Sequence, residues 1–183
     1  MDKQEETSIR KADHIDLAFS SQVAHNDLRF NYEPLLAGHP NTSLSPVEFL
    51  GKELRAPIWI SSMTGGSAEG GRINQNLAKA CKEFGLGMGL GSCRIILDDS
   101  THLADFQMRK YIGDRPFYAN LGIAQIEEVI EEGNIRNISE MMDRLDADGL
   151  IVHINPLQEW MQPEGDHIQH TPIDTIKRLI DLM

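Results

Sequence analysis

The 183-residue sequence predicts an α/β protein made of four consecutive strand–helix units. Three observations support this fold class. Short apolar runs recur about every thirty residues, which is the usual spacing of parallel βα units. These runs are almost continuously apolar, as is typical of strands in a sheet that is covered on both faces. Polar residues gather directly after each run, at the sheet edge where α/β proteins place their ligands.

The positions of the strands follow from the apolar runs, and those of the helices from apolar residues with helical spacing. We expect strands at residues 58–61, 87–90, 117–120 and 150–154. We expect helices at residues 72–84, 103–112, 123–132 and 138–145, and a last helix that opens at Thr171 and Pro172. A threonine N-cap with proline in the first turn is a favourable helix start.

The segment before the first strand is predicted to be a largely irregular N-terminal arm. Prolines and glycines interrupt it at Pro34, Gly38, Pro40, Pro46 and Gly51. Only a short helix near residues 13–20 is expected there. The sequence therefore divides into an arm of residues 1–54 and an α/β region of residues 55–183.

The number of strand–helix units leaves two architectures open. A closed (β/α)8 barrel usually needs about 250 residues, and only four units are present in this sequence. The sheet is therefore either open and doubly wound, or it is the first half of a barrel.

The composition excludes several classes of function. A net charge of −11 argues against a general nucleic-acid or anionic-membrane surface. The polar N-terminus lacks the apolar core of a secretory signal, and no run approaches the roughly 18 apolar residues of a membrane span. Cys81 and Cys93 have no metal-ligand or redox spacing, so we expect a reduced, cytoplasmic setting.

The fourth apolar run carries the most informative polar residues. His153 and Asn155 alternate with apolar residues near its end, and Pro156 then interrupts the strand ladder. Gln158 and Glu159 follow directly. A single histidine is more often structural, but this concentration of polar groups favours a functional role. Glu159 is a hard carboxylate suited to Mg²⁺ shared with a phosphorylated substrate, or alternatively a solvated loop charge.

Three other strand ends carry candidate ligand contacts. The loop Ser61–Gly66 has small residues whose exposed N–H groups suit close approach of a flat or anionic ligand, although flexible glycine loops are common. Ser92 and Arg94 follow the glycine-rich second strand, and Arg94 suits either a bidentate phosphate contact or a surface ion pair. Asn120 ends the third strand. Arg10 and Lys11 matter only if the arm folds back over this edge.

Taken together, these motifs resemble those of the type 2 isopentenyl-diphosphate Δ-isomerases, which are FMN-dependent (β/α)8-barrel enzymes. The resemblance spans nearly the whole chain in family order. Its elements are Arg10-Lys11-x-x-His14, Leu28-Arg29-Phe30, the SMTGG loop, Ile73-Asn74 with Leu77-Ala78, GLGMGLGSCR, Asn120-Leu121-Gly122 and HINPLQE…QPEGD.

The resemblance implies a role for each matching site residue. The flavin contacts would be Met63, Thr64, Gly65, Ser92 and Asn120. The pocket of the diphosphate substrate would be lined by Arg10, Lys11, Ser92, Arg94, His153, Asn155 and Gln158. Glu159 would bind Mg²⁺. No side chain is assigned as the catalytic acid or base, because the resemblance implies that reduced FMN takes that role, with NADPH as the flavin reductant.

The resemblance also implies that the fold is the first four βα units of a barrel. The family continues well beyond the position of Met183 and adds the loops that hold the FMN phosphate. We therefore expect residues 1–183 to be inactive by themselves. Unpaired sheet edges further favour a homo-oligomer.

Two rival functions stay open at this point. One is an FMN-dependent oxidoreductase on the same barrel, which turnover without net redox change would exclude. The other is a non-catalytic half-barrel that binds a ligand or partner, which a folded but flavin-free protein would favour.

Overall fold

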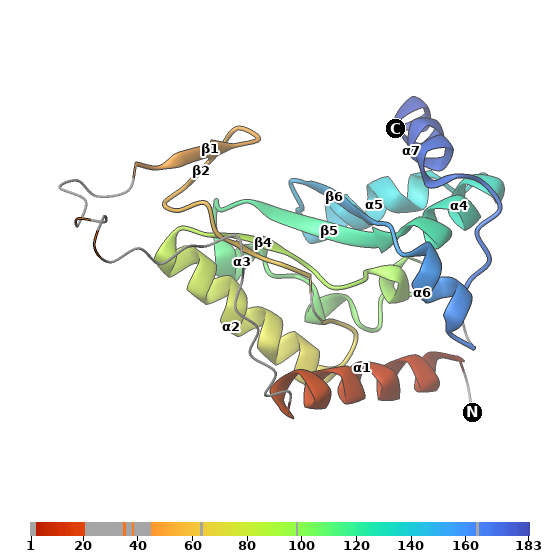
Figure 1. The fold of residues 1–183 in the computed structure, drawn as a ribbon, viewed down its shortest axis with the longest axis horizontal. Coiled ribbons are helices and arrows are strands. Elements are labelled where there is room, and N and C mark those ends of the chain that lie inside the picture. Colours follow the sequence, from red (N-terminus) through yellow and green to blue (C-terminus); the bar gives the residue numbers. More distant parts are fainter. Residues whose placement is uncertain are drawn as a thin grey trace.

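The computed structural model describes residues 3–20, 35, 38, 45–62, 64–97, 99–163 and 165–183, without the side chains of residues 3–10 and of His14. Its centre is a sheet of four parallel strands (Figure 1). The strands are β3 (Trp59–Ile60), β4 (Gly87–Gly89), β5 (Phe117–Gly122) and β6 (Gly149–His153), and they pair in that order. The prediction of four parallel strands at these positions is confirmed.

The prediction of half a (β/α)8 barrel is corrected. In the described part of the chain, the four parallel strands form an open sheet with β3 and β6 at its edges. A separate antiparallel pair, β1 (Val47–Phe49) with β2 (Lys52–Leu54), precedes them. The observed fold is an open α/β sheet with an antiparallel hairpin, and no barrel is shown.

The helices of the α/β region agree closely with the predicted ranges, with two exceptions, the unpredicted α6 and the broken helix at residues 103–112. The helices in the α/β region are α2 (Ala68–Phe84), α3 (Arg109–Ile112), α4 (Ile123–Glu131), α5 (Arg136–Leu145), α6 (Pro156–Met161) and α7 (Pro172–Leu182). The helix expected at 103–112 is broken into the 3₁₀ turn η2 (Leu103–Asp105) and the short α3, and a second 3₁₀ turn, η1 (Arg94–Ile96), follows β4. As predicted, Thr171 caps α7, because its side chain accepts a hydrogen bond from the amide of Asp174.

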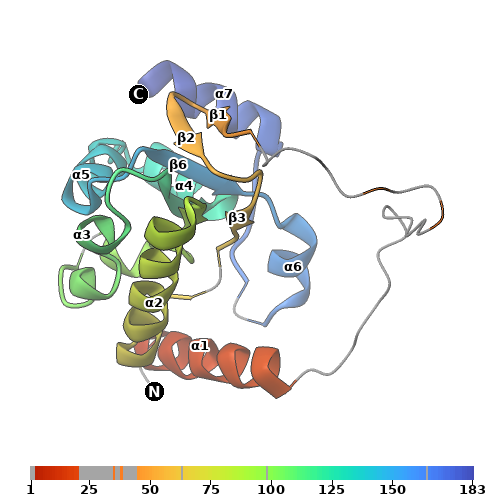
Figure 2. The same ribbon diagram turned by 90° about the vertical axis from the view of Figure 1, so that its left-hand side faces the viewer.

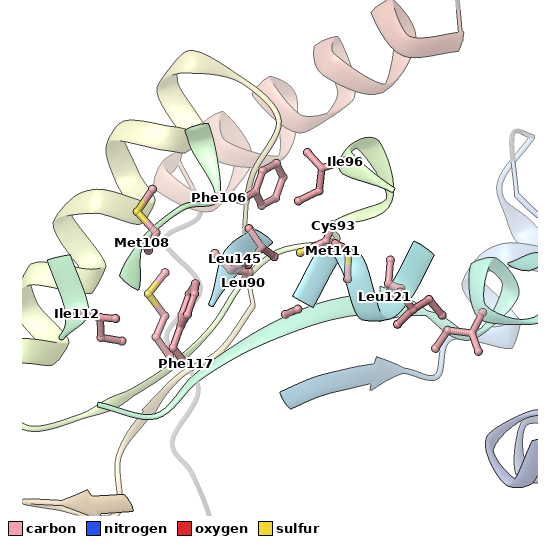
Figure 3. Close-up of a cluster of buried hydrophobic side chains, with 14 of the residues drawn as sticks. Leu90, Cys93, Ile96, Phe106, Met108, Ile112, Phe117, Leu121, Met141 and Leu145 are labelled. Atoms are coloured by element: carbon pink, nitrogen blue, oxygen red, sulfur yellow. The ribbon is translucent and has the colours of Figure 1, made fainter. Parts of the chain in front are cut away.

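One face of the sheet forms the hydrophobic core. Phe117, Ala119 and Leu121 alternate along β5 and are fully buried. They pack with residues such as Leu90 and Phe106, and with Met141 and Leu145 from α5 (Figure 3). Alternation along the strands therefore directs the residues between them to the opposite face.

The opposite face explains the glycine-rich second strand. A Cβ atom at Gly87 would lie 2.0 Å from the Trp59 ring, and one at Gly89 would lie 2.5 Å from Ile151 Cδ1. Close packing against the backbone is thus the reason for these glycines. Trp59 also packs against the ring of Phe49 from the hairpin, with ring centroids 5.3 Å apart.

The N-terminal segment is more regular than predicted. Helix α1 extends over Lys3–Ser20 rather than beginning near residue 13, and the hairpin β1–β2 lies where an irregular chain was expected. Both views show α1 running beneath one end of α2 (Figures 1 and 2). The division at residue 54 stays a prediction. Within the described residues, no helix combines the length and hydropathy needed to span a bilayer.

An ion-pair cluster ties the hairpin to the amino-terminal edge of the sheet. The Asp148 carboxylate lies 3.0 Å from Lys52 Nζ and 2.9 Å from Arg109 Nη2, and accepts a hydrogen bond of 2.8 Å from the amide of Phe117. Burial raises the pKa of Asp148, but these hydrogen bonds outweigh it and hold the pKa below its usual value. Asp148 therefore stabilises the fold above the pKa of the unfolded carboxyl, and this stability is lost as the pH falls through the folded pKa.

Asp148→Asn is expected to lower the free energy of unfolding by about 2 kcal/mol, because it leaves two partly buried cations without their carboxylate. Urea unfolding at pH 7 measures the change. Asp114→Asn is the matched control, because Asp114 also contacts Lys52, at 2.9 Å, but its side chain is 99% exposed. Equal unfolding midpoints for the parent and Asp148→Asn would show that the cluster does not stabilise the fold.

Candidate functional site

The carboxyl ends of the four parallel strands meet at one edge of the sheet. The strand register pairs Ile60 with Met88, Gly89 with Tyr118 and Gly122 with His153. The same edge consequently holds Thr64 and Ser92, which follow β3 and β4, and Asn120 and His153, which lie among the last residues of β5 and β6, as predicted. Figure 1 shows α6 and the beginning of α4 beyond the end of β5.

The loop after β3 is held by hydrogen bonds from β5 and from α2. Asn120 Nδ2 donates to Ser62 Oγ at 3.0 Å, and Asn74 Nδ2 donates to the carbonyl of Thr64 at 3.2 Å. Thr64 is 5% exposed, and its Oγ1 atom is buried without a hydrogen-bond partner among the described residues. Gly65 is required by packing, because a Cβ atom there would lie 2.1 Å from the Phe106 ring. The predicted flavin contact Met63 lies outside the described residues.

Helix α1 brings a cation to this loop. Lys11 Nζ lies 5.7 Å from the centroid of the Phe106 ring and 3.0 Å from the position that a Cβ atom on Gly66 would occupy. The arm therefore reaches the strand ends, which is the condition that the sequence set for a role of Lys11. The backbone of Arg10 belongs to the same helix, but its side chain lies outside the description.

The turn after β4 holds Ser92 and Cys93 in place. The amide of Cys93 donates to the carbonyl of Asn120 at 2.7 Å, and Ser92 Oγ accepts a hydrogen bond of 3.4 Å from the amide of Arg94. Burial raises the pKa of the Cys93 thiol to about 12. Cys93 is fully buried and therefore an uncharged packing residue at neutral pH.

Arg94 lies in a network of acidic and amide side chains. Its two terminal nitrogens both contact the Asp166 carboxylate, Nη1 closely and Nη2 at 3.4 Å, and Nη2 lies 3.9 Å from Glu128 Oε2. Gln125 Nε2 donates to the same Asp166 carboxylate at 2.7 Å. Arg94 thus forms an ion pair, as one alternative predicted. Because its side chain is still 37% exposed, the geometry also leaves it accessible for the other alternative, a phosphate contact.

The segment after β6 places Glu159 beside this network. The strand ends at His153, one residue before the predicted end, and the short helix α6 follows instead of a loop. Asn155 Nδ2 donates to Glu159 Oε1 at 2.8 Å, and the amide of Asp166 donates to Glu159 Oε2 at 2.9 Å. Asn155 Oδ1 is buried without a partner in the described part of the chain.

The structure joins only some of the predicted site residues. Arg94, Asn155 and Glu159 belong to one hydrogen-bonded network, and Asn120 to another around Ser62. His153 and Gln158 are exposed at the same edge, and Gln158 Oε1 lies 3.5 Å from Asn155 Nδ2. Among the described residues, no group of three or more His, Cys, Asp or Glu side chains is arranged to hold a metal ion. The single carboxylate of Glu159 is nevertheless a suitable ligand for Mg²⁺, because this ion usually keeps waters and substrate phosphates as its other ligands.

Sequence reasoning missed the two residues that link this network, Gln125 and Asp166. Gln125 lies in the first turn of α4 and is 6% exposed, which is unusual for a glutamine and indicates a specific partner. Asp166 was recognised only as the last residue of the QPEGD motif. Its partner Arg94 is 72 positions away, so no local pattern identifies the pair.

Comparisons with known proteins find relatives that share one name. Isopentenyl-diphosphate delta-isomerases from Mycolicibacterium vanbaalenii, Pelodictyon phaeoclathratiforme and Nostoc sp. are 40%, 38% and 38% identical to this chain. The matches extend over 164, 168 and 181 residues, which are 86%, 87% and 95% of this chain. They cover 47%, 46% and 51% of the relatives, so the chain spans about half the length of the curated relatives it matches. No family model matches the chain.

These relatives require a correction to the identification made from motifs. Their names state the isomerase but specify neither a type nor a flavin. The chain was also expected to be half of a barrel, which the open sheet and separate hairpin do not show. The identification as a type 2, FMN-dependent enzyme is therefore replaced by the coarser statement that the chain is similar to isopentenyl-diphosphate delta-isomerases.

Proposed function

We propose that this chain forms part of an isopentenyl-diphosphate delta-isomerase that interconverts isopentenyl and dimethylallyl diphosphate. The observation that carries the proposal is the network of Arg94, Asp166, Glu159 and Asn155 at the carboxyl edge of the sheet. It supplies a guanidinium and a carboxylate within one connected group, and Lys11 adds a cation at the same edge. The isomerase name of the relatives supports this choice of substrate.

The proposed role of the chain is to bind and orient the diphosphate. A diphosphate carries several negative charges, and an acidic protein with net charge −11 can bind it only where cations are concentrated locally. Arg94 provides paired N–H donors for phosphate oxygens, while Lys11 provides a point charge. His153 and Gln158 are exposed nearby and would add hydrogen bonds. Fixing the diphosphate places the alkene of the substrate in one orientation, which contributes to rate by proximity.

The cofactors FMN, Mg²⁺ and NADPH are further proposals for this site. Two buried oxygen atoms at the strand ends, Thr64 Oγ1 and Asn155 Oδ1, have no partner among the described residues, and the residues around them fit a bound group. Glu159 would hold Mg²⁺, and Thr64, Gly65, Ser92 and Asn120 would contact the flavin. When bound, reduced FMN would supply acid–base chemistry, and NADPH the electrons that keep it reduced. A homo-oligomer likewise stays a prediction.

A turnover assay tests the proposed function. Residues 1–183 replace the matched segment of the Nostoc relative, and the chimera is incubated with isopentenyl diphosphate, FMN, NADPH and Mg²⁺. We expect dimethylallyl diphosphate by NMR, with no NADPH consumed beyond the equivalent that reduces the FMN. A folded chimera that forms no product would contradict the proposal. The same assay on residues 1–183 alone tests the prediction that this chain is inactive by itself.

Glu159→Gln in the chimera tests the Mg²⁺ role. The substitution keeps the shape of the side chain but removes its charge, so the Mg²⁺ concentration for half-maximal turnover should rise at least about tenfold. Glu69→Gln is the control, because Glu69 is 54% exposed on α2 and contacts only Arg72 among the described residues. An unchanged Mg²⁺ requirement in Glu159→Gln would remove Glu159 from the metal site.

A further inference from the structure

We propose that Asp166 is a positioning residue that holds the Arg94 guanidinium in the orientation needed to bind a diphosphate group. This inference rests on the function proposed above and deepens it, because it assigns a role to a residue outside the predicted site. Asp166 does not contact the substrate in this proposal. It acts through Arg94.

The contacts of Arg94 support this role. The Asp166 carboxylate accepts from Nη1 and from Nη2, so it fixes the plane of the guanidinium as well as its position. A guanidinium carries five N–H donors, and these two hydrogen bonds use one on each terminal nitrogen. The other donors remain in the fixed plane, where they can meet phosphate oxygens.

Asp166 is itself held from two sides. Gln125 Nε2 donates to its Oδ2 atom at 2.7 Å, and its own amide donates to Glu159 Oε2 at 2.9 Å. The side chain of Asp166 is 23% exposed, so solvent competes little for the carboxylate. Asp166 therefore connects the anion-binding arginine to the proposed Mg²⁺ ligand through one residue.

The local sequence explains how Asp166 reaches this position. A Cβ atom at Gly165 would lie 1.7 Å from the carbonyl oxygen of Glu159, so only glycine allows the loop to approach α6 so closely. A Cβ atom at Gly122 would lie 2.2 Å from Gln125 Oε1, so the Gln125 side chain folds over a bare backbone. Two glycines thus permit the contacts that fix the carboxylate.

A double-mutant cycle with inorganic pyrophosphate tests the inference. Isothermal titration calorimetry on residues 1–183 measures the Kd of the parent, Asp166→Asn, Arg94→Lys and the double variant. Asp166→Asn keeps the shape but loses the charge, and it should raise the Kd about tenfold, equivalent to about 1.4 kcal/mol. In the Arg94→Lys background, where no planar fork remains to be oriented, the same change should alter the Kd less than about twofold.

Three further variants separate positioning from general damage. Asp166→Glu restores the charge and should recover part of the lost affinity. Gln125→Ala leaves the Arg94–Asp166 ion pair but removes the hydrogen bond that holds the Asp166 carboxylate. We therefore expect a smaller loss of affinity than in Asp166→Asn. This variant replaces Asp166→Asn in the test if Asp166→Asn does not fold. Glu128→Gln is the control, because Glu128 lies 3.9 Å from Arg94 and should change the Kd little.

The outcomes distinguish this inference from the proposed function. An unchanged or lower Kd in Asp166→Asn, equal losses in both arginine and lysine backgrounds, or no binding of pyrophosphate by the parent would each overturn it. A coupled cycle in a protein whose chimera shows no turnover would support the positioning role and refute the isomerase. Turnover by the chimera, together with equal effects of Asp166→Asn in the arginine and lysine backgrounds, would support the isomerase and refute the positioning role.

Discussion

Glu127→Gln is expected to lower the free energy of unfolding by about 3 kcal/mol, because it removes a buried charge that three donors share. Glu127 lies in α4 and is 3% exposed. Its carboxylate accepts hydrogen bonds from the amides of Gln169 and His170, at 3.0 and 2.8 Å, and contacts the His170 ring at Nδ1. A glutamine would place an NH₂ group against some of these N–H donors. Urea unfolding at pH 7 measures the loss.

The same residue gives the stability a defined pH dependence. Burial raises the pKa of Glu127, but the hydrogen bonds from His170 and Gln169 outweigh it, so the pKa lies below its usual value. The stabilisation is therefore complete above the pKa of the unfolded carboxyl, about 4.3, and decreases as the pH falls through the folded pKa. Glu128→Gln is the matched control, because this neighbour is 57% exposed. Similar losses in both variants would show that Glu127 has no special role.

Gly91→Ala is expected to destabilise the protein by about 3 kcal/mol, at the upper end of overpacking substitutions. A Cβ atom at position 91 would lie 2.6–2.7 Å from the backbone N, C and O atoms of Thr64. These atoms belong to the loop after β3 and cannot rotate away as a flexible side chain would. Thermal unfolding measures the change. Gly38→Ala is the control, because a Cβ atom there meets nothing within 4 Å.

Gly91→Ala should also disturb ligand binding at the strand ends, since the loop that it displaces carries Thr64 and Gly65. A parent-like melting temperature for this variant would mean that the strand ends are less closely packed than the structure shows.

The sheet was predictable because its signals are local. Apolar runs such as 150–154 and the threonine–proline start at Thr171 depend on neighbouring residues only, and each produced the expected element. The hairpin at Val47–Leu54 was not found, because its strands are only three residues long and Pro46 and Gly51 indicated an irregular chain. Its position depends instead on Lys52 meeting Asp148 and on Phe49 meeting Trp59, which are tertiary contacts.

The sequence predicted which strand ends carry the site residues, but not which side chains these residues contact. Parallel strands bring their carboxyl ends together, so Ser92, Asn120 and His153 could be placed at one edge from the strand order alone. The sequence could not show that Arg94 pairs with Asp166 across 72 positions, because this contact depends on the path of the loop after α6. It also could not distinguish an open sheet from half of a barrel, since both begin with the same βα repeat.

The most direct test of the account maps where the substrate binds. In ¹⁵N-labelled protein, isopentenyl diphosphate should shift the amide signals of Gly65, Ser92, Arg94 and Asn120, at the carboxyl edge of the sheet. The opposite edge offers a second pair of cations, Lys52 and Arg109, whose side chains are 24% and 19% exposed, compared with 37% for Arg94. Their signals should stay in place. Shifts confined to Lys52, Arg109 and their neighbours, with the strand ends unchanged, would contradict the assignment of the carboxyl edge as the substrate site.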